Sequence, residues 1–209
     1  MNRPGHPNLM RRIPDPERPA GRPTRPAQAD DVALLQRVMA RDLRGFEQLY
    51  RAYRPRLKRF LDPMTTRAGI VDEVINDTML LVWHRADAYN HQSKVSTWIF
   101  AIAYRKTLKA LRREGVSASA DDADDEGADS EPGPEQRAVR RETLAVLQDA
   151  LQALSFEHRA VLNLTYFHGL GYREIADIVE CPVDTVKTRM FHARRRLRAM
   201  LAGELGDWL

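Results

Sequence analysis

The feature that most limits how this chain of 209 residues can fold is an acidic stretch between residues 115 and 136. It contains eight Asp or Glu residues, no Lys or Arg, and no large hydrophobic side chain other than Val116. Such a segment repels itself and has too little apolar surface to join a core, which predicts a flexible linker. The chain is therefore expected to fold as two separate units, one on each side of it.

The N-terminal segment, residues 1–29, is rich in proline and arginine, with seven of the chain's twelve prolines and six arginines. It has too few apolar residues to offset the entropy of ordering, so a disordered basic tail is expected. A net charge of +4 mildly favours a polyanionic partner. Without a spanning apolar run, a signal-peptide core or a second cysteine beside Cys181, the sequence predicts a cytoplasmic protein with no membrane insertion.

The first unit, residues 30–114, shows hydrophobic residues at helical spacing and no strand-like alternation. Helices are expected over about 68–85 and 95–113, and Pro55 is expected to bend or restart an earlier one. The residues of 68–85 expected to face inward are Val71, Val74, Ile75, Thr78 and Val82. The buried face of 95–113 is expected to hold Val95, Trp98, Ile99, Ile102 and Ala103. The opposite face would then present Thr97, Phe100, Ala101, Tyr104, Arg105, Lys109 and Arg112.

The second unit, residues 137–202, contains the pattern of a helix-turn-helix. Ser155 is a good N-cap for one helix, a short helix is expected over 172–179, and a break at residues 180–182 precedes a long helix to about 201. An apolar seam runs along that long helix through Val186, Met190, Ala193, Leu197 and Met200. Residues 203–209 form a C-terminal tail. The expected fold is all-α, with two small helical domains, a helical bundle and a helix-turn-helix, joined by the flexible acidic linker.

The outward side of the long helix suits DNA, because the N-terminal part of a recognition helix enters the major groove. Lys187, Thr188 and His192 are placed for base edges, with Phe191 beside them. The arginines are better placed for the phosphate backbone: Arg189, Arg194, Arg195, Arg196 and Arg198. The alternative is an amphipathic terminal helix with a basic, solvated face.

Two surfaces of the first unit suggest further contacts. Tyr104, Arg105 and Lys109 combine a ring with cations, which suits unstacked bases and phosphates. The carboxylates of Asp72, Glu73 and Asp77 could suggest acid–base catalysis or a metal, but no histidine or nucleophile accompanies them at useful spacing. A protein-docking face is favoured, with a solvated face as the alternative, and no catalytic residue, metal site or cofactor is predicted.

Four stretches occur in an order typical of one family: "FEQLYRAYRPRLKRFL", "DEVINDTMLLVW", "STWIFAIAYRKTLKALRRE" and the run from "LSFEHRAVLNLTYFHGLGYREIADIVECPVDTVKT" to "RMFHARRRLRAML". In this order, around an acidic linker, they resemble extracytoplasmic-function sigma factors, the small bacterial RNA polymerase specificity subunits. The resemblance covers roughly residues 30–114 and 137–200.

The resemblance implies that the first unit is a sigma-two domain that docks on the clamp helices of the polymerase's largest subunit through Glu73, Asn76 and Asp77. It implies that the same domain opens the minus-ten element and holds a flipped-out base in the loop 90–96, at a cost of a few kcal/mol. The implied minus-ten contacts are Asn90, Ser93, Lys94, Ser96, Thr97, Tyr104, Arg105 and Lys109.

The second unit is implied to be a sigma-four domain that docks on the flap of the second-largest subunit, with the linker in the RNA exit channel. The implied minus-thirty-five contacts are Lys187, Thr188, Arg189, Phe191, His192, Arg194 and Arg195. An anti-sigma factor is implied as a further partner. The sequence departs from the family's habit at Asn76, Arg105 and His192, where many members have glutamine, asparagine and arginine.

Two other classes of function compete with the sigma factor. The first is a free-standing helix-turn-helix repressor or activator, which would dimerise on symmetric half-sites. The second is an enzyme that uses Asp72, Glu73 and Asp77, for which the sequence offers no phosphate loop, zinc spacing or catalytic triad.

Overall fold

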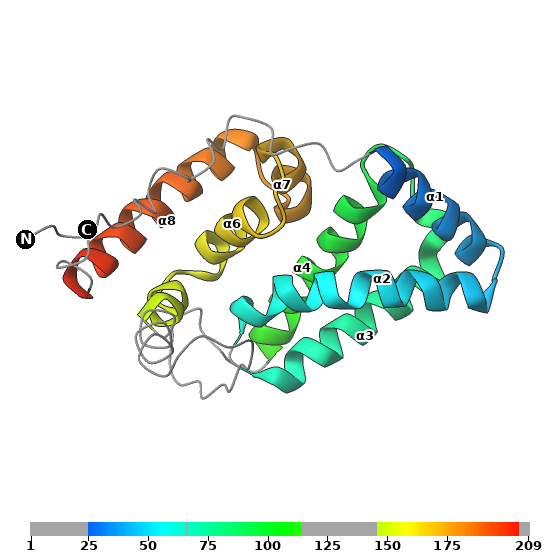
Figure 1. Cartoon of the computed structure of the whole chain (residues 1–209), viewed down its shortest axis with the longest axis horizontal. Helices are drawn as coiled ribbons and strands as arrows, with labels where there is room; N and C mark the ends of the chain where they lie inside the picture. Colours follow the sequence, from blue (N-terminus) through cyan, green and yellow to red (C-terminus); the bar gives the residue numbers. More distant parts are fainter. Residues whose placement is uncertain (1–24, 66, 114–145, 205–209) are drawn as a thin grey trace, which may run out of the picture.

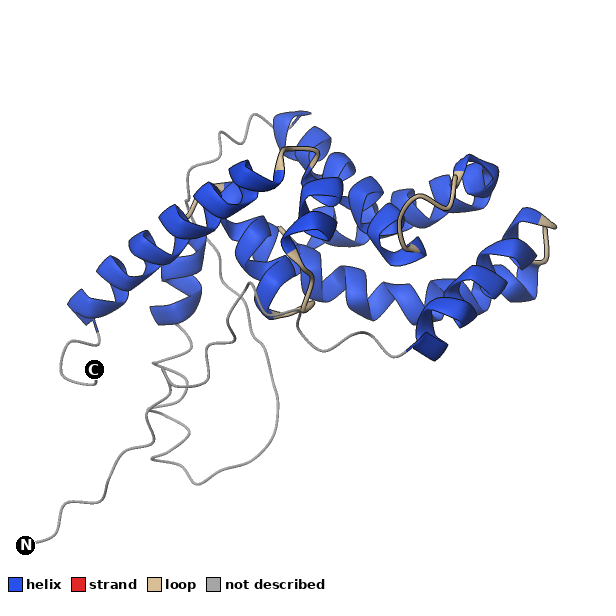
Figure 2. Cartoon of the chain, turned by 90° about the horizontal axis from the view of Figure 1, so that it is seen from above, coloured by secondary structure: helices blue, strands red, loops and turns tan. Residues whose placement is uncertain are grey.

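The structure, a computed structural model, describes residues 25–65, 67–113 and 146–204. These residues form helices joined by loops, with no strand among them, as expected from the sequence (Figure 2). The predicted linker, most of the predicted N-terminal tail and the last five residues lie outside this part of the chain. The elements are α1 (Arg25–Met39), α2 (Leu43–Leu61), η2 (Asp62–Met64), α3 (Ala68–Arg85), η3 (Ala86–Ala88), α4 (Val95–Arg113), α6 (Phe156–Tyr166), α7 (Tyr172–Val179) and α8 (Val183–Glu204), with a further helical stretch at 146–152.

The helix α1 begins inside the segment that the sequence assigned to the tail. It starts at Arg25 rather than near Asp30. Pro26 is compatible with this start, because proline has the right φ for the first turn of a helix and its missing N–H is not needed there. Five residues of the predicted tail are therefore helical.

The helix α2 runs without interruption through Pro55, so it does not restart there. The side chain of Asp42 caps its first turn by accepting a hydrogen bond from the Arg44 N–H at 2.9 Å. Proline leaves the carbonyl of the residue four positions earlier, Arg51, without its helical donor. Both Pro55 and Arg51 are exposed, so water can replace that hydrogen bond.

The helices α1 to α4 pack into one bundle, the first domain (Figure 1). The bounds of α3 and α4 agree with the sequence predictions. The predicted inward residues of α3 are all buried: Val71, Val74, Ile75, Thr78 and Val82. Helical spacing alone therefore located these two elements and the core face of α3.

The helix α4 is covered on both sides, which was not expected from the sequence. Figure 1 shows α4 between α2 and α3 on one side and α7 on the other. The prediction that its second face is exposed is wrong for Thr97, Phe100, Ala101 and Tyr104, which are all buried. The reason is that α7 of the second domain packs against α4, and Phe156 of α6 lies against the Tyr104 ring.

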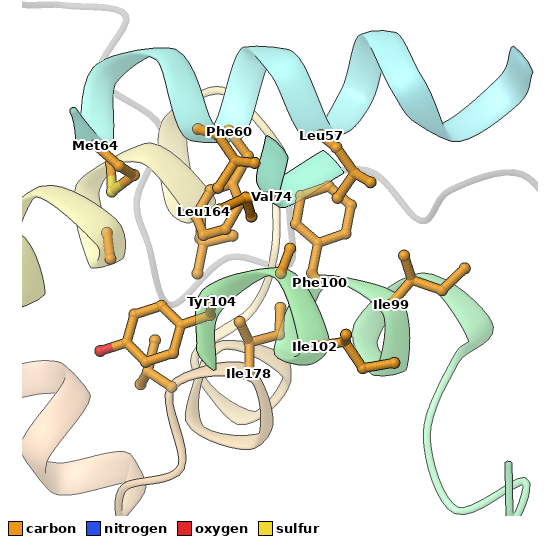
Figure 3. Close-up of a cluster of buried hydrophobic side chains, with 14 of the residues drawn as sticks. Leu57, Phe60, Met64, Val74, Ile99, Phe100, Ile102, Tyr104, Leu164 and Ile178 are labelled. Atoms are coloured by element: carbon orange, nitrogen blue, oxygen red, sulfur yellow. The ribbon is translucent and has the colours of Figure 1, made fainter. Parts of the chain in front are cut away.

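A single cluster of buried side chains extends across both domains. Figure 3 shows Leu164 of α6 and Ile178 of α7 together with Phe60, Phe100 and Tyr104 of the first domain. Polar contacts reinforce this boundary: Arg159 donates to the Pro63 carbonyl at 3.0 Å, and the Asn163 amide donates to the Arg59 carbonyl at 3.4 Å. We call this packing the closed arrangement.

The second domain contains the expected helix-turn-helix. Ser155 caps α6 by accepting a hydrogen bond from the His158 N–H at 3.4 Å, as predicted. α7 ends at Val179, and its C-cap residue Glu180 has a left-handed conformation with φ of 52° that turns the chain toward α8. Ile175 and Ala176 of α7 are buried, as are Val186 and Met190 of α8. In Figure 1, α8 extends away from the first domain.

Candidate nucleic-acid interface

An exposed stripe of polar, basic and aromatic side chains runs along α8. Spacings of three or four residues place its members on one side of the helix, away from the buried Val186, Met190 and Ala193. The stripe comprises Lys187, Thr188, Phe191, Arg195 and Arg198, and His192 is exposed at its flank. Phe191 is 62% exposed, an unusual surface position for a large ring. This arrangement offers cations and hydrogen-bonding groups together to one partner surface.

Two of these side chains have local partners in the first turn of α8. The Lys187 ammonium lies 3.2 Å from the Asp184 carboxylate, and the Thr188 hydroxyl donates to the Asp184 carbonyl at 2.9 Å. Both remain exposed and are free to exchange these local partners for a ligand. Exposed ion pairs of this kind contribute little to stability, about 0–1 kcal/mol, so exchange is inexpensive.

Two arginines predicted to contact DNA have hydrogen-bond partners within the second domain. The Arg189 guanidinium is half-buried and donates to the Cys181 sulfur at 3.7 Å. Arg194 Nε donates to the Tyr166 hydroxyl at 2.8 Å. These two side chains therefore brace the helix-turn-helix in this structure, whereas Arg195 is exposed.

His192 has aromatic neighbours on both sides. Its ring centroid lies 5.4 Å from that of Phe191 and 6.4 Å from that of His158. Burial lowers the pKa of His158, and the nearby His192 adds to that effect. A neutral His158 is thereby favoured beneath the exposed ring of His192.

The closed arrangement buries some of the residues predicted to contact the minus-ten element and leaves others at the surface. Tyr104 is buried with its ring centroid 5.3 Å from that of Phe156, and burial raises its pKa to about 12. Thr97 is also buried, and its hydroxyl has no hydrogen-bond partner among the described residues. Neither side chain can reach a ligand while the second domain covers α4.

Two cations from the same predicted set form ion pairs with the second domain. The Lys94 ammonium lies 2.6 Å from the Glu174 carboxylate of α7. Arg105 pairs with Glu180, at the end of α7. Neither acidic partner was predicted from the sequence, because nothing in the local pattern of α7 indicates a contact with α4.

The remaining minus-ten candidates lie on or near the surface. Asn90 is exposed, and its side-chain oxygen accepts a hydrogen bond from the Gln92 N–H at 3.1 Å. The Ser93 carbonyl accepts one from the Tyr89 hydroxyl at 2.6 Å. Ser96 is half-buried, whereas Lys109 is exposed on α4. The hydrogen bond from the buried Tyr89 thus holds the loop before α4 in place, while the polar side chains of this loop remain accessible.

The predicted docking residues form an exposed row on α3, each with a partner in the first domain. Glu73 lies 3.0 Å from Arg113, Asp77 lies 2.8 Å from Lys106, and Asn76 accepts a hydrogen bond from the Tyr50 hydroxyl at 2.8 Å. Leu80, one turn further along α3, is 54% exposed. This apolar neighbour was not predicted from the sequence, although its helical spacing from Glu73, Asn76 and Asp77 could have identified it.

Metal-ligand clusters and membrane-spanning helices are both absent from the part of the chain that the structure describes. No three His, Cys, Asp or Glu side chains there come together as metal ligands. None of the helices in that part has the length and apolar character needed to cross a membrane.

These features define an all-α protein of two domains whose second domain carries a basic recognition helix. The family model described as sigma-70 region 2 matches residues 49–116, and the model described as sigma-70 region 4 matches residues 144–197. The ECF RNA polymerase sigma factor RpoE of Cereibacter sphaeroides is 31% identical over 173 residues, which are 82% of this chain and 94% of that protein. The chain belongs to the family of ECF RNA polymerase sigma factors.

Further relatives agree in sequence and in fold. The RNA polymerase sigma-H factor of Pseudomonas aeruginosa is 27% identical over 179 residues, 81% of this chain and 93% of that protein. The structure of CnrH in complex with the cytosolic domain of CnrY matches with a TM-score of 0.63 at 23% identity, over 83% of this chain and 98% of CnrH. The RpoE structure from Bartonella quintana, in complex with the anti-sigma factor NepR, matches with a TM-score of 0.58 at 22% identity, over 76% and 98% of the two chains.

Proposed function

We propose that this sigma factor reads the minus-thirty-five promoter element with the exposed stripe of α8. The observation that carries this proposal is the joint exposure of Lys187, Thr188 and Arg195 on one side of a helix-turn-helix recognition helix. Lys187 and Thr188 lie near the N-terminus of α8, the part that enters the major groove in this class of motif. Arg195 lies two turns later, where phosphate contacts fix the orientation of the helix.

Docking on core RNA polymerase is assigned to the exposed row on α3. Glu73 and Asp77 supply charge, Asn76 supplies an amide, and the exposed Leu80 supplies apolar area. A polar rim around an apolar contact is the usual composition of a protein interface. The factor itself recognises the promoter and catalyses no reaction of its own. It acts in the cytoplasm, where the polymerase transcribes the DNA of the nucleoid.

Capture of the minus-ten element is assigned to α4 and the loop before it, and it requires the two domains to separate. Tyr104 and Thr97 are buried under the second domain, and Lys94 and Arg105 are paired with its carboxylates. Separation would expose a ring beside several cations, the combination that suits an unpaired DNA strand. Polymerase and promoter would bind the open arrangement and shift the population toward it.

An anti-sigma factor is proposed as the partner that holds this chain inactive. The structures of CnrH and of the Bartonella RpoE each hold a second protein, the cytosolic domain of CnrY and the anti-sigma factor NepR respectively. A protein that binds the closed arrangement would stabilise it at the expense of the open one.

The proposal is tested by transcription from defined promoters with purified core RNA polymerase of a closely related bacterium. Adding this chain is expected to give transcripts with one fixed start site, whereas core enzyme alone gives none. A free-standing repressor would instead bind a palindromic duplex as a dimer without polymerase. Tight binding of that kind, together with no promoter-specific transcript, would overturn the proposal.

A further inference from the structure

A cavity of about 400 Å³ lies at the boundary of the two domains. Its wall is formed by α2 and α4 of the first domain and by the loop between α6 and α7 of the second. The side chains that line it include Arg56, Arg59, Ser96, Phe100, Phe167 and His168. Among the residues that line the cavity there is no carboxylate, so its charge is positive.

The two arginines of the cavity are not neutralised equally. Arg56 lies 3.7 Å from the Asp31 carboxylate and stacks over the Tyr53 ring at 4.5 Å. Among the described residues, Arg59 forms no ion pair with a carboxylate. Its guanidinium therefore has hydrogen-bond donors available for an anion, and guanidinium groups match phosphate oxygens well.

Further groups border the cavity. His168 lines it, and the Nε2 atom of this side chain, which solvent does not reach, has no hydrogen-bond partner among the described residues. Backbone N–H groups at the start of α4 can donate to an anion. Ser96 lies in the first turn of α4, where backbone N–H groups have no acceptor within the helix and favour anions.

We propose that this cavity binds a small molecule that carries phosphate groups. Its volume lies within the range of about 300–1,000 Å³ typical of small-molecule sites, which often occur at domain boundaries. Arg56 and Arg59 would hold the phosphate groups, and the half-exposed ring of Phe167 offers a surface for a flat ring system. The ligand would touch both domains at once.

A bridging ligand has a consequence for regulation, and this part rests on the proposed sigma function. The cavity exists only where α2 and the α6–α7 loop meet, so a ligand that fills it favours the closed arrangement. Because Tyr104 is buried in that arrangement, the ligand would delay minus-ten capture. It would therefore lower promoter-specific transcription without touching the exposed stripe of α8.

The binding is tested with the full-length protein alone, by titration calorimetry at physiological salt. The probes are pyrophosphate, which supplies phosphate groups only, and GDP, which adds a ring system. The variants are Arg59→Gln on the first domain's side, Phe167→Ala on the second domain's side, and Arg51→Gln as a matched control. Arg51 lies on the same helix and pairs with Glu47, and it does not line the cavity.

Saturable binding of either probe is expected, with affinity reduced about tenfold by Arg59→Gln and unchanged by Arg51→Gln. For GDP, a further loss with Phe167→Ala would assign the ring contact to the second domain. Absence of saturable binding for both probes, or an equal loss in the Arg59 and Arg51 variants, overturns the proposal. Because no polymerase is present, either result is separate from the test of sigma activity, and circular dichroism checks that each variant is folded.

Discussion

The guanidinium of Arg105 on α4 pairs with the carboxylate of Glu180, the C-cap residue of α7. This ion pair joins a residue predicted to contact the minus-ten element to the turn of the helix-turn-helix. It links the two DNA-binding parts of the molecule while neither is bound to DNA. The state of this pair therefore reports whether the domains are closed or open.

Reversing the charge of one partner is expected to open the domains. Both side chains are about half exposed, so the pair contributes no more than about 1 kcal/mol, and Glu180→Arg should shift the closed-to-open ratio by about fivefold. The shift is measured by energy transfer between dyes on Met39→Cys and Arg198→Cys, both exposed, in a Cys181→Ser background.

The matched control and the rescue use the same assay. Arg51→Glu reverses a charge on α2 that pairs with Glu47 on the same helix, and it should leave the energy transfer unchanged. The double variant Arg105→Glu with Glu180→Arg restores opposite charges and should restore closure. If the double variant stayed as open as the single one, the pair would not stabilise the closed arrangement.

Acidification is expected to open the domains through His168. Its ring lies 4.9 Å from the Phe100 ring and 6.0 Å from the Phe60 ring. Burial, helped by the positive charges of Arg56 and Arg59, lowers its pKa from 6.5 to about 4. Separation of the domains would return the ring to water and its pKa to about 6.5.

The direction of this pH dependence follows from proton binding. Between these two pKa values the open arrangement binds more protons, so closure is fully favoured above about pH 6.5 and weakens as the pH falls toward 4. Allowing for partial exposure of the ring, the loss at pH 4 is roughly 1–3 kcal/mol. The same dye pair, followed from pH 7 to pH 5, measures the first part of this loss before most carboxylates titrate.

A variant without an ionisable ring separates His168 from other groups. His168→Leu should flatten the pH profile of the energy transfer, whereas His84→Leu, at an exposed position on α3, should leave it unchanged. An identical profile in the His168→Leu protein and the unmodified one would assign the effect to another group.

Two kinds of substitution on α8 should have different effects on promoter choice. Thr188→Ala removes a hydroxyl placed for a base edge, and it should cost about 1–3 kcal/mol on the preferred minus-thirty-five sequence and little on others. Arg195→Gln removes a proposed phosphate contact, and it should weaken all sequences alike and reduce the salt dependence of binding. Holoenzyme binding to a panel of promoter variants distinguishes the two, and indistinguishable profiles would contradict the assigned orientation of α8.

Docking on the polymerase should depend on the charge of α3. Asp77→Lys reverses an exposed carboxylate in the proposed docking row and should weaken binding to core enzyme at least tenfold, because like charges at an interface are costly. Glu47→Lys is the control, since Glu47 is an exposed carboxylate paired with Arg51 on another helix. Equal affinities of the two variants for core enzyme, measured by fluorescence anisotropy, would move the docking surface elsewhere.

Local patterns were sufficient to predict the elements of each domain. Hydrophobic spacing located α3 and α4, and the Ser155 cap and the break after Val179 located α6 and α7. These signals operate within a few residues, so they do not depend on what packs outside the helix. The restart considered at Pro55 does not occur, because the cost of proline depends on whether water can reach the freed carbonyl, which spacing does not reveal.

The closed arrangement could not be predicted in the same way. The contacts of Lys94 with Glu174 and of Arg105 with Glu180 join residues far apart in the sequence. Each of these charged side chains could equally well be solvated by water, so its identity does not indicate that it has a partner. One signal was nevertheless present. The first half of α4 is apolar almost all round, which is typical of a helix buried on two sides. The burial of Phe100 and Tyr104 follows from that composition.

Glu180 has two opposing effects on stability: its left-handed backbone conformation is unfavourable, whereas its side chain joins the two domains. A non-glycine residue at φ of 52° strains the backbone by about 1 kcal/mol, and glycine would relieve that strain. Glycine would also remove the carboxylate that pairs with Arg105. The same substitution would therefore stabilise the helix-turn-helix and weaken the contact between the domains. The residue at position 180 thus sets a balance between the stability of the helix-turn-helix and the ease with which the two domains separate.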